Sequence, residues 1–185
     1  MTARPDNIFL TGFSTSGKTT LGRKLARKLK MRFYDTDRLI EKKEKQPITL
    51  IFKEKGEKYF RTQENKIIRQ VVDRPGQKVV ALGGGAFLNK ANRELVQAYG
   101  IVVYLSCSVR ELYRRLKVLK GRPLLVFDTK KYPDRATRIE SVKQLLATRQ
   151  SNYNKADYRI STTNKSITLS VNQIIKKIKN ARIKS

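Results

Sequence analysis

Gly12-Phe-Ser-Thr-Ser-Gly17-Lys18-Thr19 is the stretch of this sequence that decides its fold. It fits the pattern G-x-x-x-x-G-K-[ST], follows the apolar run Ile8–Leu10, and precedes a stretch with leucines at helical spacing (residues 21–29). Strand, glycine-bounded loop and helix are the context of a phosphate-binding loop. Its backbone N–H groups would point at phosphate oxygens, with Lys18 on the β- and γ-phosphates and the Thr19 hydroxyl on Mg²⁺. The motif therefore predicts that the chain binds ATP or GTP.

Strand-like and helix-like segments alternate along the whole chain, which favours a parallel sheet covered by helices on both faces. Two of the strand candidates are continuous apolar runs, typical of strands buried on both sides. The expected strands are Ile8–Phe13, Arg32–Tyr34, Lys78–Leu82, Gly100–Ser106 and Tyr158–Ser161. The expected helices are Lys18–Lys30, Thr36–Lys45, Glu57–Arg74, Ala91–Tyr99, Val109–Lys120, Thr137–Asn152 and Val171–Ala181. We expect one domain over residues 1–185, with a mobile lid at about 121–137.

Polar and glycine-rich segments follow the first three strands, and ligands of such sheets bind at the carboxyl ends of the strands. Asp35 and Asp37 come after the second strand and Gly83–Gly85 after the third. One aspartate could hold Mg²⁺ through water, and the other could accept a proton from an attacking hydroxyl, since the chain has no histidine. Capping of the next helix explains the aspartates equally well. A tight turn explains the glycines as well as a backbone that approaches a ligand.

Three arginines are candidates for binding anionic groups. Arg61 lies three residues before Glu64, on one helical face, and could fork onto a carboxylate or form a surface ion pair. Arg122 falls in the expected lid, from which it could stabilise a transferring phosphoryl group. Arg149 lies near the end of a helix, where a cation also relieves the helix dipole.

The composition bounds the class of protein. The chain has 185 residues, 42 Lys and Arg against 15 Asp and Glu, and one cysteine, so an internal disulfide is excluded. No apolar run reaches the ~20 residues of a membrane span. The first expected strand begins at Ile8, which leaves no room for a signal peptide, so we expect a cytoplasmic protein. The net charge of +27 indicates polyanionic partners, of which ATP is one. A solvated lysine-rich surface explains the remainder better than nucleic-acid binding does.

The motifs in their order resemble those of shikimate kinases, from Asn7 to the last helix. They are the phosphate loop, F-Y-D-x-D at 33–37, G-E-x-x-F-R-x-x-E at 56–64, G-G-G at 83–85, R-P-L-L at 122–125 and R-x-x-x-Y at 149–153. The resemblance implies a monomeric three-layer α/β/α enzyme of nucleoside monophosphate kinase-like fold. Its five-stranded parallel sheet would have the order 2-3-1-4-5. It would transfer the γ-phosphoryl group of ATP to the 3-hydroxyl of shikimate, in the pathway to chorismate and the aromatic amino acids.

The resemblance also implies a role for each motif residue. Lys18, Asp37 and Arg122 would be catalytic, with Asp37 as the base and Arg122 as the lid arginine. Mg²⁺ would be held by Thr19 and, through water, by Asp35. The implied ATP-binding residues are Gly12, Thr15, Ser16, Gly17, Lys18, Thr19, Thr20, Arg115, Arg122 and Lys165. The implied shikimate-binding residues are Asp37, Arg61, Glu64, Gly83, Gly84, Gly85 and Arg149, within and beyond a helical segment at about 36–74.

Three departures from the family pattern and two alternative functions accompany this interpretation. One departure is the tail after Asp157, which is unusually basic. Thr15 stands where the family usually has glycine, and the stretch between Arg122 and Arg149 is longer than is typical for the family. A related kinase for gluconate or a nucleotide shares the phosphate loop, but the pair Arg61 and Arg149 argues against it. A polyanion- or RNA-binding protein on a kinase scaffold is the other alternative, motivated by the net charge.

Overall fold

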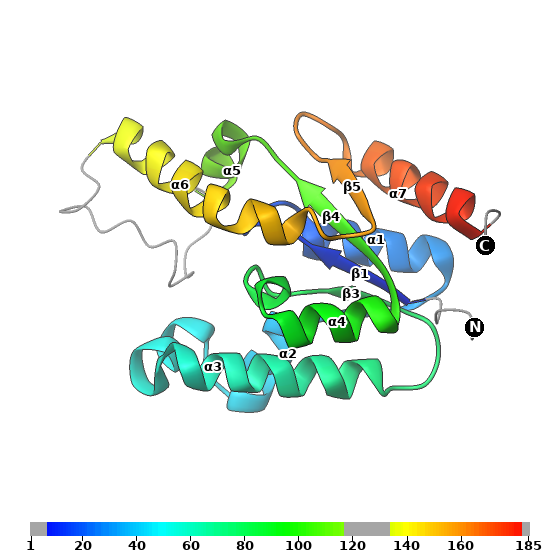
Figure 1. The fold of residues 1–185 in the computed structure, drawn as a ribbon, viewed down its shortest axis with the longest axis horizontal. Coiled ribbons are helices and arrows are strands. Elements are labelled where there is room, and N and C mark those ends of the chain that lie inside the picture. Colours follow the sequence, from blue (N-terminus) through cyan, green and yellow to red (C-terminus); the bar gives the residue numbers. More distant parts are fainter. Residues whose placement is uncertain (1–6, 117–133, 183–185) are drawn as a thin grey trace.

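Five parallel strands form the centre of the computed structural model, which describes residues 7–116 and 134–182 (Figure 1). They are β1 (Asn7–Thr11), β2 (Arg32–Asp35), β3 (Lys78–Ala81), β4 (Gly100–Ser106) and β5 (Tyr158–Ser161). Their order is β2-β3-β1-β4-β5, with Leu10 of β1 opposite Ala81 on one side and Val103 on the other. The expected fold and strand order are therefore confirmed.

Helices cover both faces of this sheet. They are α1 (Lys18–Leu29), α2 (Thr36–Glu44), α3 (Ile48–Val72), α4 (Lys90–Ala98), α5 (Val109–Leu116), α6 (Arg135–Tyr153) and α7 (Ile167–Arg182), with a 3₁₀ turn, η1, at Ala86–Leu88. α1 and α7 lie side by side on one face, whereas α3, α4 and α6 lie on the other (Figure 1). Three layers of α/β/α result.

Side chains of the central strand, β1, point alternately to the two faces of the sheet and so contribute to two separate apolar cores. Ile8 and Leu10 of β1 pack with Leu25 of α1 and Ile174 of α7. The intervening residue, Phe9, joins the core on the other face, built from α2 to α6. All of these side chains are at most 1% exposed. Burial of large apolar side chains contributes about 1.5–3 kcal/mol each, so both helical layers are fixed against the sheet and hold its carboxyl edge rigid.

Several helices begin earlier than the sequence pattern predicted. α3 starts at Ile48 after Pro47, not at Glu57, and passes through Gly56, whose φ of 78° and ψ of 170° break the helical geometry. Pro47 and Gly56 are both helix breakers, and they concealed the helical spacing of the apolar residues between them. α6 starts at Arg135, capped by the Asp134 side chain, so the last residues of the expected lid belong to a helix. The rest of that lid, residues 121–133, and the expected end of α5 at Lys120 lie outside the described residues.

Charge is distributed unequally between the two helical layers. Neither α1 nor α7 contains an acidic residue, and Lys24 and Lys28 of α1 donate hydrogen bonds to neutral partners, Thr168 and Asn172. On the opposite layer, ion pairs join acidic and basic side chains of α2 to α6. Within residues 7–116 and 134–182 no helix has the length and apolarity needed to cross a bilayer.

Candidate active site

A cavity of about 600 Å³ opens at the carboxyl edge of the sheet and takes in most of the predicted site residues. It is lined by the phosphate loop, the ends of β2 and β3, α3, α5, α6 and the turn after β5. Parallel strands all end at this edge, so segments distant in the sequence meet there. Thr20 and Lys165, two of the implied ATP-binding residues, also line the cavity.

The phosphate loop depends on glycine at two positions. Gly12 has φ 140°, and a Cβ there would lie 2.6 Å from the Leu105 carbonyl oxygen, well inside the contact distance of real Cβ atoms. Gly17 has φ 101° at the start of α1. The ammonium group of Lys18 curls over the loop and donates to the carbonyl oxygens of Gly12 (2.8 Å) and Phe13 (2.9 Å). A phosphate seated on the loop would meet this buried cation and the N-terminus of α1.

Thr15, the residue at the family's usual glycine position, adopts the left-handed conformation with φ 63°. A β-branched residue rarely takes this conformation, because its Cβ crowds the backbone. Two contacts hold it in place. Its hydroxyl donates to the Leu112 carbonyl oxygen at 3.4 Å, and its own carbonyl oxygen accepts from Arg115 at 3.2 Å. The substitution therefore ties the loop to α5.

Thr19 and Asp35 form the oxygen-rich corner next to the phosphate loop. The Thr19 hydroxyl donates to Asp35 Oδ2 at 2.6 Å, and Asp35 Oδ1 accepts from the backbone N–H of Arg38 at 3.3 Å as the N-cap of α2. The helix cap and the Thr19 hydroxyl thus use different oxygens of one carboxylate. No cluster of three or more His, Cys, Asp and Glu side chains that could enclose a metal occurs in the described ranges. Mg²⁺ is commonly held by one or two protein oxygens together with substrate phosphates, and this corner fits that use.

Two carboxylates meet at Gly83, at the other end of the cavity. A Cβ on Gly83 would lie 2.5 Å from Glu64 Oε1 and 2.6 Å from Asp37 Oδ1, so only glycine fits between them. Glu64 is 1% exposed and forms an ion pair with Arg61 at 2.8 Å, and Arg61 also pairs with Glu57 at 3.0 Å. Burial raises the pKa of Glu64 to about 7, and the neighbouring Arg61 guanidinium opposes the shift. Arg61 is thus held between one buried carboxylate and one exposed carboxylate.

α6 brings a second arginine to the same end of the cavity. Arg149 is 8% exposed, and its guanidinium carbon lies 5.5 Å from the centre of the Phe13 ring. One helical turn later the Tyr153 hydroxyl donates to the Gly84 carbonyl oxygen at 2.6 Å. A Cβ on Gly85 would lie 2.6 Å from the Arg61 guanidinium, so this glycine lets Arg61 approach the turn. Asp37, Arg61 and Arg149, from three helices, therefore surround one pocket.

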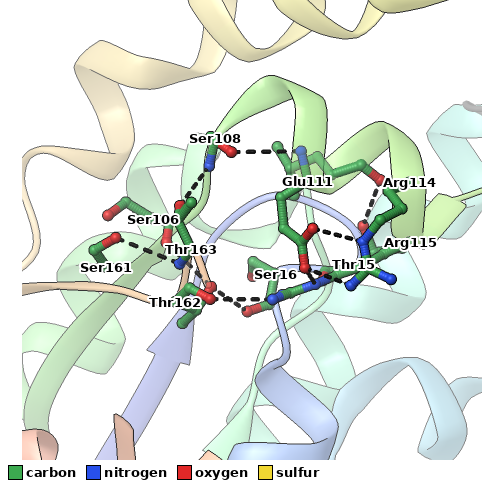
Figure 2. Close-up of polar contacts among 11 residues, drawn as sticks. Thr15, Ser16, Ser106, Ser108, Glu111, Arg114, Arg115, Ser161, Thr162 and Thr163 are labelled. Atoms are coloured by element: carbon green, nitrogen blue, oxygen red, sulfur yellow. Dashed lines mark hydrogen bonds and ion pairs between the residues drawn. The ribbon is translucent and has the colours of Figure 1, made fainter. Parts of the chain in front are cut away.

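Arg115 defines the remaining wall, on the side of α5 and β5 (Figure 2). Its Nε donates to Glu111 Oε1 at 2.9 Å, and its terminal nitrogens donate to the carbonyl oxygens of Thr15 and Thr162. Glu111 also accepts two bonds of 2.7 Å from Arg114. These hydrogen bonds, that from Arg114 first, lower the pKa of Glu111 to about 2. The guanidinium plane of Arg115 is therefore fixed at the edge of the cavity.

Comparison with known proteins shows which family has this sequence and fold. The family model described as shikimate kinase matches residues 14–179. This chain belongs to the shikimate kinase family. A shikimate kinase of Sulfurihydrogenibium sp. is 43% identical over 94% of this chain and 98% of its own, and one of Persephonella marina is 39% identical over 94% and 99%. The structure of Acinetobacter baumannii shikimate kinase in complex with shikimate superimposes with a TM-score of 0.86, at 34% identity over 96% of this chain and 94% of that one.

More distant similarities extend to other kinases of the same fold. A gluconokinase from Sinorhizobium meliloti has a TM-score of 0.56 at 16% identity, which shows a shared fold only. Fold alone does not assign a substrate, because function depends on the site grafted onto it. In this chain the feature that bears on the substrate is the pair of arginines, Arg61 and Arg149, that lines the cavity.

Some residues of the site were not predicted from the sequence, and one predicted residue is not placed. Glu111, four residues before Arg115, carries an i,i+4 ion-pair signal that could have revealed it. The anchoring of Gly84 by Tyr153 joins residues 69 positions apart, and no local pattern announces it. Arg122 lies outside the described residues, so its role as the lid arginine stays a prediction.

Proposed function

We propose that this protein transfers the γ-phosphoryl group of ATP to the 3-hydroxyl of shikimate, giving shikimate 3-phosphate and ADP. The observation that carries the proposal is one continuous cavity with two chemically different ends. One end offers a phosphate loop with a buried lysine, and the other offers two arginines beside two carboxylates. Family membership supports the same substrates, as does the relative solved with shikimate.

In this mechanism the phosphates of ATP bind the N-terminus of α1, and Lys18 turns from the loop carbonyls to the transferring phosphoryl group. The Thr19 hydroxyl and, through water, Asp35 would hold Mg²⁺, which when bound neutralises charge on the phosphate oxygens. Phosphoryl transfer depends chiefly on positioning and positive charge, because the protein takes little part in covalent chemistry. These residues therefore supply most of the stabilisation at the nucleotide end.

At the acceptor end, Arg61 and Arg149 would clamp the carboxylate of shikimate, since a planar guanidinium matches a carboxylate in two parallel bonds. Glu64 orders Arg61, and the backbone at Gly83–Gly85 would contact the ring hydroxyls. Asp37 would accept the proton of the 3-hydroxyl as its oxygen attacks the γ-phosphorus. The bond from that phosphorus to the bridging oxygen then breaks, and ADP leaves. Arg122 would stabilise the transferring group from the lid.

We further infer that a single chain suffices and that it works in the cytoplasm. All groups assigned above, Gly83 and Arg122 apart, line one cavity of one chain. Cys107, the one cysteine, is a buried free thiol, which suits a reducing compartment. Sedimentation or light scattering at working concentration tests the monomeric state.

A coupled assay of ADP release tests the function. Mg²⁺-ATP is supplied with shikimate, quinate, gluconate and nucleoside monophosphates in parallel reactions. The proposal predicts turnover with shikimate and background rates with gluconate and the nucleotides. Turnover with gluconate or a nucleoside monophosphate but none with shikimate contradicts it. Silence with every acceptor despite ATP binding also contradicts it, and would direct attention to the basic face of α1 and α7.

A further inference from the structure

Three hydrogen bonds hold the guanidinium of Arg115, and two of them end on main-chain carbonyls (Figure 2). The acceptors are Glu111 Oε1 at 2.9 Å, the Thr15 oxygen at 3.2 Å and the Thr162 oxygen at 3.0 Å. The N–H bonds of a guanidinium lie in its plane. Three acceptors around the edge therefore fix the whole group, and the group in turn fixes the carbonyl of Thr15 in the phosphate loop.

Thr162 holds the next carbonyl of the same loop. Its hydroxyl lies 3.1 Å from the Ser16 carbonyl oxygen and 3.2 Å from that of Ser106, at the end of β4. Its backbone N–H donates to the same Ser106 oxygen at 2.8 Å, and the residue is 3% exposed. Consecutive carbonyls of the phosphate loop, those of Thr15 and Ser16, are thus attached to α5 and to the end of β5.

Fixing these carbonyls also sets the direction of the amides that follow them. The peptide unit is planar and trans, so its N–H points opposite to its C=O. Holding the Ser16 oxygen on Thr162 therefore aims the N–H of Gly17 away from β5. The backbone at Thr15 also needs to be restrained, because a β-branched residue rarely adopts a φ of 63° unless other contacts hold it there.

We propose that Glu111, Arg115 and Thr162 form a brace that holds the phosphate loop in its phosphate-binding shape. Glu111 and Thr162 are positioning residues in this arrangement, because they act through Arg115 and the loop carbonyls. The proposal rests on the proposed function, since it concerns the ATP end of the same cavity. Its consequence is that the α5 side of the site contributes to binding the triphosphate itself, in addition to any contact with the base.

A triphosphate ligand that lacks the nucleobase separates binding of the phosphates from contact with the nucleobase. Calorimetry measures the dissociation constants of ATP and of inorganic tripolyphosphate for the full chain, at about 0.15 M salt to screen the basic surface. The variants keep side-chain shape: Glu111→Gln replaces the carboxylate with a neutral and weaker acceptor for Arg115, and Thr162→Val removes the hydroxyl that bonds the Ser16 carbonyl oxygen. Arg114→Gln is the matched control, because Arg114 bonds the same carboxylate from an exposed position without touching the loop. Lys18→Met gives the background of anion binding elsewhere.

The brace predicts that Glu111→Gln and Thr162→Val each weaken both ligands by about threefold to tenfold. Glu111→Gln removes a negative charge near the site, so general electrostatics alone would tighten anion binding; the predicted change has the opposite sign. Arg114→Gln, by contrast, should leave the affinities for both ligands close to those of the wild type. In steady-state assays KM for ATP should rise while KM for shikimate stays unchanged.

Unchanged or tighter tripolyphosphate binding in Glu111→Gln would overturn the proposal, whether or not ATP binding weakens. A loss in Arg114→Gln as large as that in Glu111→Gln would overturn it too. If Thr162→Val fails to fold, as circular dichroism would show, Glu111→Gln on the helix surface decides alone. Failure of the proposed function is distinct: the wild-type chain would then show brace-dependent tripolyphosphate binding without phosphorylating shikimate.

Discussion

The two ends of the cavity are built from different materials. At the nucleotide end the chain uses main-chain groups: a loop with two glycines at positive φ, a helix N-terminus, and carbonyls held from outside by Arg115 and Thr162. At the acceptor end it uses charged side chains from three helices, packed against Gly83–Gly85. The nucleotide end can be recognised from one contiguous sequence motif. The acceptor end is formed by residues that are distant in the sequence and come together only when the chain folds. Substitutions of side chains should therefore separate acceptor binding from ATP binding.

Asp37→Asn should give the largest effect, because it removes the proton acceptor where the two ends meet. General-base catalysis contributes roughly 10²- to 10⁴-fold, so kcat should fall by about that factor. The dissociation constant of ATP should change little, since the phosphate loop is untouched. Glu54→Gln, which alters an exposed carboxylate of α3 away from Arg61, is the control. Near-normal kcat in Asp37→Asn would show that the base has been assigned to the wrong residue.

Arg61→Ala should raise KM for shikimate by about tenfold to a hundredfold, as expected for losing hydrogen bonds to a charged group. KM for ATP should stay close to that of the wild type. Arg69→Ala removes an exposed cation two turns along the same helix and should change neither constant. An unchanged KM for shikimate in Arg61→Ala contradicts the carboxylate clamp.

Glu64 makes stability depend on pH at the acceptor end. Its pKa is raised from 4.5 in the unfolded chain to about 7, so the folded state binds the proton more tightly. The corresponding contribution is fully present below pH 4.5 and is lost as the pH rises through about 7. Relative to Glu64→Gln, the wild-type chain should lose on the order of 3 kcal/mol of unfolding free energy between pH 4.5 and pH 7. Urea unfolding of both proteins across the window measures this; a constant difference would mean that Glu64 titrates normally.

Tyr153→Phe should give the smallest of these effects. It keeps the ring and its stacking on Tyr104, 5.0 Å between centroids, and removes the hydroxyl that donates to Gly84 and also interacts with Arg149. A buried hydrogen bond contributes about 1 kcal/mol, so KM for shikimate should rise about fivefold without change for ATP. Tyr104→Phe, which loses a longer bond to Gln150, is the matched control. Equal effects of both variants would assign the change to packing.

The sequence predicted the fold and the nucleotide end well because their signals are local. The phosphate loop, the alternation of elements and the capping Asp35 each lie in one short stretch. The start of α3 was missed because Pro47 and Gly56 interrupt its pattern, although tertiary packing of Ile51 continues the helix. The contacts of Tyr153 with Gly84 and of Thr162 with Ser16 join residues far apart in the chain. Such contacts depend on how the layers pack, which no local spacing encodes.

In the proposed reaction, the nucleotide end and the acceptor end of the cavity together direct the phosphoryl group to one oxygen of shikimate. ³¹P and ¹H NMR of a reaction containing Mg²⁺-ATP and shikimate tests it most directly, because the coupling of phosphorus to a ring proton identifies the esterified position. We expect a single phosphate monoester of shikimate, esterified at the 3-oxygen and formed in the same amount as ADP. Inorganic phosphate as the product, or phosphorus on another oxygen, would contradict it.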